Sequence, residues 1–407
     1  MNCRFCNNTL KHEFIDLVNS PPSNSYLTKE QLNEPEVFYP LKLFICENCF
    51  LVQIDEIKKA SEIFSHDYAY FSSYSTSWLD HAHRYVDMIT ERFGYDEQSQ
   101  VMELASNDGY LLQYFQKQNI SALGIEPSKN VAHAAQEKGI ETIIDFFGVK
   151  LAKHLVAQNR KADLIIGNNV FAHVPDVNDF VAGMKIALND GGVITLEFPH
   201  LLQLIEQNQF DTIYHEHYSY FSFYTASLIF DEHGLELFDV EQISTHGGSL
   251  RIYGKHKEDT SKSISSNVAD LLKEEAKAMQ NIEYYKGFQE KVNEVKINLV
   301  SFLLVQKKLD KKVVAYGAAA KGNTLLNYCG VKNDLIEFVV DASPHKQGKY
   351  LPGSHIPIVT EEMIKKNKSD YILILPWNLI TEITDQLKYI KEWDAKLVLP
   401  IPKLEII

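Results

Sequence analysis

The sequence has no long apolar run and no excess of basic residues. No stretch approaches the roughly 18 consecutive apolar residues of a membrane-spanning helix, and the first residues lack the apolar core of a signal peptide. The 40 Lys and Arg are outnumbered by 54 Asp and Glu, and the net charge of −14 argues against a general nucleic-acid binder. We therefore expect a cytoplasmic protein with no nucleic-acid or membrane partner. An anionic small ligand could still bind through backbone amides and local cations.

Cysteine is scarce, and four of the five cysteines are paired. Cys3 with Cys6 and Cys46 with Cys49 form two CxxC motifs, and Cys329 stands alone. In a reducing compartment such motifs are typical of metal ligands rather than disulfides. Four thiolates complete a tetrahedral site with no open position for water, so we predict a structural zinc. Four unrelated buried cysteines would not explain the spacing, and a redox CxxC would need a βαβ unit beside it.

The length of 407 residues allows two or three domains. From residue 100, short apolar runs such as "VMEL", "ALGIE" and "ADLIIGNN" alternate with helix-length segments, which predicts βαβ units and a parallel sheet. After the helix "TASLIFDEHG", two strands, "LELFDVEQI" and "GSLRIYG", follow with no helix between them. A parallel sheet that ends in such a hairpin resembles the core of class I S-adenosylmethionine (SAM) methyltransferases.

Acidic side chains end three successive predicted strands. Ligands of doubly wound sheets bind at the carboxyl ends of the strands, where Glu103, Glu126 and Asp145 would lie. We predict that Glu126 accepts both ribose hydroxyls of SAM, while Asp145 and Phe146 hold the adenine amine and ring face. Helix capping accounts for one of these acids but poorly for all three, and no lysine follows the turn as a phosphate loop would require. The other predicted cofactor-binding residues are Ala105, Asn107, Gly109 and Asn168.

Residues 259–312 contain few glycines and no proline. Apolar side chains repeat there at spacings of three and four, which predicts an amphipathic helix with one buried stripe. We interpret this segment as a structural connector. The stripe consists of Tyr285, Phe288, Val292, Val295, Leu299 and Phe302.

A second strand–turn–helix pattern, "KVVAYGAAAKGNTLL", begins near residue 312 and is followed by the buried strands "EFVVDAS", "YILILPWN" and "KLVLPIP". We predict a smaller Rossmann-like unit. Gly317 and Gly322 would let backbone amides approach an anion beside Lys321 and Asn323, and Asp341 would bind a ribose hydroxyl. The GxxxxG spacing differs from the dinucleotide motif GxGxxG, so a nucleotide diphosphate is favoured over a nicotinamide cofactor. A packing domain without a ligand is the alternative.

Several stretches together resemble SAM-dependent nucleotide-sugar C-methyltransferases, such as those that add the branch methyl of mycarose or tetronitrose. These stretches are "ELASNDG", "NNVFAHV", "YHEHYSYFS", "THGGSLRIY", "GAAAKGNTLL" and "LPWN". Ala105 stands where relatives often have glycine. We expect an α/β protein with a four-cysteine zinc module (1–75), a methyltransferase core (76–258), a helical connector (259–312) and a Rossmann-like domain for the nucleotide sugar (313–407).

The resemblance implies methyl transfer to carbon 3 of a 4-keto-6-deoxy nucleotide sugar, dTDP- or GDP-linked, in branched deoxysugar biosynthesis. It implies that the four paired cysteines bind zinc. It also places six residues at the reacting centre: Tyr68, Asn169, His173, Tyr214, Glu216 and His217.

The stretch "YHEHYSYF" at 214–221 suits this chemistry, because methylating carbon requires a base for the proton beside the ketone and donors for the enolate oxygen. We predict His217 as the base, Glu216 as its helper and Tyr214 as a donor to the sugar oxygen. His173 would lie near the methyl donor, and Asn169 would position the sugar or the methionine moiety. A half-buried β edge would explain the same residues without catalysis. Two further hypotheses are a nicotinamide-dependent oxidoreductase using the C-terminal unit and a non-catalytic zinc-ribbon adaptor.

Overall fold

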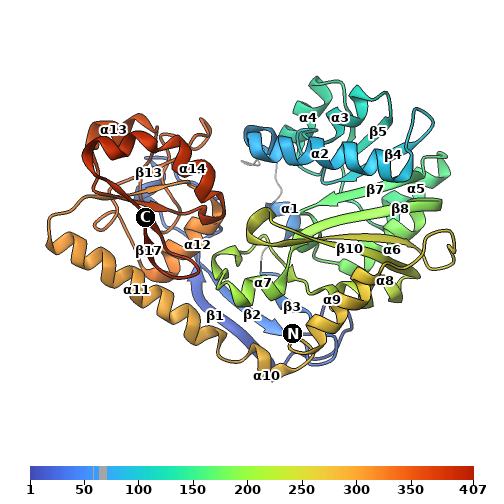
Figure 1. Cartoon of the computed structure of the whole chain (residues 1–407), viewed down its shortest axis with the longest axis horizontal. Coiled ribbons are helices and arrows are strands. Elements are labelled where there is room, and N and C mark those ends of the chain that lie inside the picture. The colour runs from blue at the N-terminus through green and yellow to red at the C-terminus, as the bar shows by residue number, and fades with distance from the viewer. Residues whose placement is uncertain (58, 64–70) are drawn as a thin grey trace.

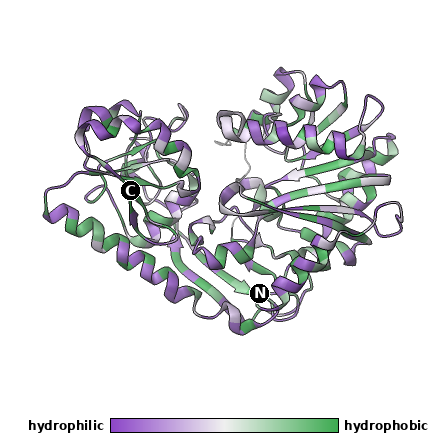
Figure 2. Ribbon diagram, in the orientation of Figure 1, coloured by the Kyte–Doolittle hydropathy of each residue, from purple (hydrophilic) through white to green (hydrophobic). Residues whose placement is uncertain are grey.

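The computed structural model describes residues 1–57, 59–63 and 71–407, and within them the chain forms three β-sheets. Figure 1 shows the largest sheet in one lobe and the C-terminal unit in the other, with N-terminal strands below and between them. The strands of the largest sheet are mostly hydrophobic, and the helices around it carry alternating hydrophilic and hydrophobic stripes (Figure 2). This colouring fits helices that cover a buried sheet.

The N-terminal sheet is antiparallel and has the order β1-β2-β3-β9. Its first three strands are β1 (His12–Ser20), β2 (Tyr39–Ile45) and β3 (Val52–Ile54), and the short helix α1 (Ala60–Ile63) follows. The fourth strand, β9 (Ser219–Tyr220), comes from the stretch "YHEHYSYF" and pairs Tyr220 with Val52. That stretch therefore joins the N-terminal sheet to the segment that follows the central sheet.

The central sheet has seven strands in the order β10-β11-β8-β7-β4-β5-β6. Its parallel strands are β4 (Gln100–Leu104), β5 (Ser121–Ile125), β6 (Glu141–Ile143), β7 (Ala162–Asn168) and β8 (Leu188–Pro199). The antiparallel hairpin β10 (Leu235–Ile243) and β11 (Ser249–His256) pairs with β8. The predicted parallel sheet with a terminal hairpin is thus confirmed.

Seven helices belong to this lobe in the described part of the chain. They are α2 (Thr76–Phe93), α3 (Leu112–Lys117), α4 (Lys129–Glu137), α5 (Val149–Ala157), α6 (Val177–Ala187), α7 (Leu201–Glu206) and α8 (Phe223–Glu232). The long helix α2 is capped at its N-terminus by Ser75, whose side chain accepts the Trp78 N–H, and at its C-terminus by Gly94 with φ +70°. It carries Trp78 and His81 over the sheet.

The connector consists of α9 (Ser266–Ala276), α10 (Ile282–Tyr285) and α11 (Phe288–Lys308) rather than one helix, with Gly287 at φ +82° before α11. All six side chains of the predicted stripe are buried. Phe288 stacks on Phe14 of β1 with ring centroids 5.0 Å apart. The stripe therefore packs in one hydrophobic core with the N-terminal sheet and the C-terminal unit.

The C-terminal sheet has the order β14-β13-β12-β15-β16-β17 and is parallel except for β17. Its strands are β12 (Val313–Tyr316), β13 (Val339–Val340), β14 (Ile358–Val359), β15 (Tyr371–Ile374), β16 (Lys396–Leu399) and β17 (Glu405–Ile406). Its helices are α12 (Ala320–Cys329), α13 (Glu362–Asn367) and α14 (Ile380–Gln386). The predicted strand–turn–helix run is confirmed as β12 followed by α12.

Across the described ranges, none of the helices combines the length and apolarity that a membrane crossing demands.

Candidate active site

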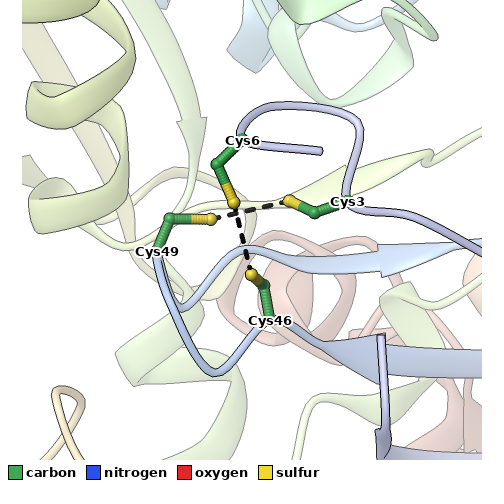
Figure 3. A group of neighbouring side chains, drawn as sticks. All are labelled: Cys3, Cys6, Cys46 and Cys49. Carbon is green, nitrogen blue, oxygen red and sulfur yellow. Dashed lines mark hydrogen bonds between the residues drawn. The ribbon is translucent and has the colours of Figure 1, made fainter. Parts of the chain in front are cut away.

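The four paired cysteines meet at one point (Figure 3). Their sulfur atoms all lie within 4.8 Å of one another, and the Cys3–Cys49 and Cys6–Cys46 pairs are each 3.5 Å apart. A tetrahedral zinc with Zn–S bonds of about 2.3 Å separates its sulfurs by about 3.8 Å, so the cluster fits this ion. None of these cysteines forms a disulfide.

Hydrogen bonds hold the cysteine cluster to the N-terminal sheet and to the start of α6. The Arg4 guanidinium donates to the carbonyls of Ile54 and Pro175, at 2.5 and 2.9 Å. The Asn178 amide donates to the carbonyls of Arg4 and Phe5. Pro175 and Asn178 flank the start of α6, just after the loop that carries His173, so the metal module contacts the chain next to that loop.

Glu126 organises the turn between β4 and α3. Its two carboxylate oxygens accept the backbone N–H groups of Asn107, at 3.0 Å, and Ser128, at 2.7 Å. Ala105, Asn107 and Gly109 all have positive φ, a backbone conformation that is strained for alanine and ordinary for glycine. Burial raises the pKa of Glu126, and the two backbone hydrogen bonds oppose this rise.

Several buried polar atoms at the carboxyl ends of these strands have no hydrogen-bond partner within the described residues. Both amide atoms of Asn168 and the Oε2 atom of Glu103 belong to this set. Burial raises the pKa of Glu103 well above its usual range. Such orphaned groups are costly unless a ligand satisfies them, so the turn fits a polar cofactor such as SAM. Asp145 and Phe146 follow β6 and are exposed, at the rim of this region.

Three aromatic side chains predicted at the reacting centre lie together. The ring centroids of His217 and Tyr214 are 4.1 Å apart, and those of His217 and His173 are 4.7 Å apart. The Nδ1 atom of His217 lies 2.9 Å from the Thr212 carbonyl, and that of His173 lies 2.8 Å from the Glu216 carbonyl. Burial lowers the pKa of His173 to about 4 and that of His217 well below its ordinary value.

Glu216 is buried and bound by a segment that the sequence did not indicate. Its Oε1 atom accepts a 2.7 Å hydrogen bond from the Asn24 amide, in the loop between β1 and β2. The neighbouring Tyr26 hydroxyl lies 3.4 Å from Asn24 Oδ1 and donates to the Ala318 carbonyl at 2.7 Å. This loop therefore runs from Glu216 to the C-terminal unit. The stretch "PPSNSY" carried no recognisable signal for this role.

The residues predicted to bind a nucleotide in the C-terminal unit do not all face the same way. The Asp341 carboxylate accepts the Ala318 N–H at 2.8 Å, and Lys346, which the sequence reasoning missed, lies 3.4 Å from it. A Cβ at Gly317 would meet Pro376 at 2.4 Å, and one at Gly322 would meet Leu375 at 2.7 Å. Close packing against Leu375 and Pro376, which follow β15, explains both glycines, so an anion at their backbone amides stays a prediction.

Lys321 and Asn323, on α12, point toward other parts of the chain. The Asn323 amide donates to the Ser23 carbonyl at 2.5 Å. The Lys321 ammonium lies 3.2 Å from both the His246 carbonyl and Asn378 Oδ1. His246 belongs to the turn before β11, so Lys321 reaches the methyltransferase lobe.

The other predicted residues are placed as follows. Asn169 has φ +54°, and its N–H donates to the Glu197 carbonyl at 2.7 Å, which fixes it at the end of β7. Tyr68 lies outside the described residues. Sequence reasoning also missed the buried carboxylate of Glu197, held by Arg251 at 2.7 Å and His81 at 2.8 Å. Its partners come from β11 and α2, far apart in sequence, and no short motif signals such a cluster.

Three family models match successive parts of the chain. One, described as a zinc binding domain, covers residues 3–64, and one described as a methyltransferase domain covers residues 78–240. A third, described as a C-methyltransferase C-terminal domain, covers residues 244–402. The C-methyltransferase NovU from Streptomyces niveus is 32% identical over 406 residues, spanning 100% of this chain and 96% of its own. The chain belongs to the C-methyltransferase family.

The C-methyltransferase is therefore an enzyme that uses SAM, with a methyltransferase sheet and an N-terminal zinc-binding module. Solved structures with partial likeness include a SAM-dependent methyltransferase from Anabaena variabilis, 15% identical, covering 50% of this chain and 99% of its own, with TM-score 0.37. Another is magnesium protoporphyrin IX methyltransferase from Synechocystis with bound SAM, 14% identical, covering 48% and 88%, with TM-score 0.33.

We expect Glu126→Ala to weaken SAM binding about tenfold or more, since a hydrogen bond to a charged acceptor contributes about 1.5–3 kcal/mol. Titration calorimetry with SAM measures the change. Glu141→Ala, which removes an exposed carboxylate from the neighbouring strand β6, is the matched control and should keep wild-type affinity. Unaltered affinity in Glu126→Ala would mean that the ribose binds elsewhere.

Proposed function

We propose that this C-methyltransferase methylates carbon 3 of a 4-keto-6-deoxy nucleotide sugar in branched deoxysugar biosynthesis. The proposal rests on one observation above all: His217 and Tyr214 are packed together, 4.1 Å between ring centroids, next to the methyltransferase sheet. A base beside a hydroxyl donor suits proton removal next to a ketone, which makes carbon nucleophilic. The likeness to C-methyltransferase NovU over the full chain supports transfer to carbon.

His217 is the proposed base. Because its Nδ1 faces the Thr212 carbonyl at 2.9 Å, Nδ1 carries the hydrogen and Nε2 carries the lone pair. Burial lowers its pKa, so the ring is neutral at pH 7. The proton on carbon 3 passes to Nε2, and the electron pair of the broken C–H bond forms an enolate with its charge on the oxygen at carbon 4. When bound, SAM supplies the electrophilic methyl group and leaves as S-adenosylhomocysteine.

The remaining proposed roles follow from the neighbours of His217. Tyr214 donates a hydrogen bond to the sugar oxygen. The side chain of Glu216 is held by Asn24, which fixes the Glu216 backbone. That backbone leads directly to His217, and its carbonyl lies against Nδ1 of His173. His173 has a pKa of about 4 after burial, so it is neutral and shapes the pocket rather than carrying charge. Asn169 positions the sugar or the methionine moiety at the end of β7.

The nucleoside diphosphate, dTDP or GDP, is proposed to lie against the C-terminal unit. Asp341 ends β13, and Lys346 supplies a cation beside it at 3.4 Å. Tyr26 connects this strand end to Asn24 and so to Glu216. One ligand could therefore extend from Asp341 to the reacting centre. Nothing in the described residues favours a nicotinamide cofactor, and membership of an enzyme family sets the adaptor hypothesis aside.

The test is incubation with SAM and a panel of dTDP- and GDP-linked 4-keto-6-deoxy sugars, followed by mass spectrometry. We expect one sugar to gain the mass of a methyl group in place of hydrogen, and a substrate deuterated at carbon 3 to lose its label. Product that keeps the deuterium would contradict carbon 3 as the site. Methylation of none of the keto sugars would contradict the substrate class.

A further inference from the structure

The Thr212 carbonyl determines which nitrogen of His217 carries the hydrogen. It lies 2.9 Å from Nδ1, and a carbonyl oxygen can only accept, so in the neutral ring Nδ1 donates and Nε2 keeps its lone pair. Thr212 and His217 also line one small internal cavity, together with Ala172 and Tyr220. The position of the Thr212 carbonyl is therefore part of the geometry that makes His217 able to accept a proton.

Thr212 ends the short 3₁₀ helix η4 (Phe210–Thr212), and a helix of the C-terminal unit packs directly against it. This helix is α12, which Figure 1 shows on the side of that unit facing the methyltransferase lobe. Thr324 of α12 is buried, and its hydroxyl donates to the Ile213 carbonyl at 2.8 Å. The residue that follows Thr212 is therefore held by another domain.

Asp211, the residue before Thr212, is bound by a second element of the C-terminal unit. Trp377 begins the 3₁₀ helix η6 (Trp377–Leu379), and its Nε1–H donates to Asp211 Oδ2 at 2.7 Å. Burial raises the pKa of Asp211 to about 6, and the charge of Lys321 and the Trp377 hydrogen bond oppose this rise. At pH 7 the carboxylate is therefore mainly charged, with Lys321 as its counter-charge, and a hydrogen bond to a charged acceptor is stronger than one between neutral groups.

We propose that Thr324 and Trp377 are positioning residues, which hold the Thr212 carbonyl where it keeps the hydrogen of the proposed base on Nδ1. Two hydrogen bonds between packed domains could simply join them, but these two fix the neighbours on either side of the one carbonyl that orients His217. If that carbonyl moved, His217 could rotate or take the other tautomer, in which Nε2 carries the hydrogen and accepts no proton. The inference rests on the proposed function and gives the C-terminal unit a part in proton removal.

The tautomer of His217 is the first measurement, made by NMR on the full-length, zinc-loaded protein labelled with ¹⁵N-histidine. A ring nitrogen that carries hydrogen and one that carries a lone pair differ strongly in chemical shift, and comparison with His217→Ala identifies the signals of this ring. We expect Nδ1 to carry the hydrogen in the wild type. In the double variant Thr324→Val, Trp377→Phe, which removes both donors, we expect that tautomer to be lost or mixed with the other.

Kinetics measure the consequence for the reaction, with the keto-sugar nucleotide that the wild-type enzyme methylates as substrate. In the double variant we expect kcat to fall about 10–100-fold, since a misplacement of about 1 Å can cost a reaction about 10²-fold in rate. Exchange of the carbon 3 proton with deuterated water, with S-adenosylhomocysteine bound, should fall by the same factor. KM should stay within about threefold of wild type, because neither side chain is proposed to touch the substrate.

Two variants are matched controls. Thr324→Ser keeps the hydroxyl that donates to Ile213, so it should keep the tautomer and most of kcat. Trp393 also belongs to the C-terminal unit, but its Nε1–H donates to the Ser369 carbonyl of the same unit at 3.0 Å. Trp393→Phe should therefore lower the melting temperature and leave the tautomer and kcat unchanged. Equal losses of kcat in Trp393→Phe and Trp377→Phe would show a general loosening of the unit and would contradict the inference.

The outcomes separate this inference from the proposed function on which it rests. A double variant with the wild-type tautomer and wild-type exchange would overturn the inference alone. A raised KM with an unchanged tautomer and kcat would mean that the two side chains bind the substrate, which also overturns it. A changed tautomer with wild-type exchange would show that His217 is not the base and so contradict the proposed mechanism itself. If the double variant does not fold, Thr324→Val and Trp377→Phe are measured singly in the same way.

Discussion

His217→Ala should lose the exchange of the carbon 3 proton with solvent and slow methylation by about 10²–10⁴-fold, the usual contribution of a positioned general base. The physical reason is that Nε2 of His217 carries a lone pair at neutral pH, since burial lowers the pKa and the Thr212 carbonyl holds the hydrogen on Nδ1. Deuterium uptake is measured by mass spectrometry with S-adenosylhomocysteine bound. SAM affinity should survive, because His217 is remote in sequence and in contacts from Glu126.

His215→Ala is the matched control, from the same short stretch. His215 is similarly buried, but its ring lies against Tyr39, with centroids 5.9 Å apart, and its Nε2 is 3.2 Å from the Pro40 carbonyl. It therefore faces the N-terminal sheet, and its loss should affect stability more than exchange. If His217→Ala keeps near-normal exchange and turnover, the base is another group, with Glu216 and His173 as the next candidates. A variant that exchanges the proton but does not methylate would leave His217 a positioning role.

Cys46→Ser should lower the melting temperature or the solubility of the protein sharply, and the wild type should contain one zinc per chain. Structural zinc sites contribute about 10–16 kcal/mol of apparent binding free energy in small zinc-finger peptides, and metal binding of this kind is coupled to folding. Cys46 is fully buried at the end of β2, with the other three sulfurs within 4.8 Å. Elemental analysis and calorimetric melting measure the two outcomes.

The chain supplies its own control for this experiment. Cys329 is also buried, at the end of α12, but lies outside the four-cysteine cluster. Cys329→Ser should keep the zinc, and its free energy of unfolding should fall only by the amount expected for burying a hydroxyl, about 1–3 kcal/mol. Because Arg4 ties the cluster to the loop before α6, zinc loss should also reduce activity. A metal-free protein with unchanged melting would show that the cluster holds no structural ion.

Local patterns in the sequence were enough to predict the central and C-terminal sheets and the pairing of the four cysteines in one cluster, but not the N-terminal sheet. The alternation of strands and helices follows from the spacing of apolar side chains and from turn residues, and both can be recognised within a few positions of the sequence. The hairpin β10–β11 was predicted on this basis. CxxC spacing similarly limits the position of two thiolates before any long-range contact forms. The buried stripe on the connector was correct for the same reason, although the segment forms three helices, with Gly287 between the second and the third.

Contacts between distant segments could not be read in this way. Asn24 reaches Glu216 across 192 positions and Lys321 reaches His246 across 75, and neither pair shares a local pattern. Sequence reasoning grouped Lys321 with Gly317 because the two are close in the chain, but packing of α12 against the methyltransferase lobe turns the lysine to another site. Side-chain chemistry and short spacings thus specified which groups are present, whereas the packing of three sheets in one chain determined which of them meet.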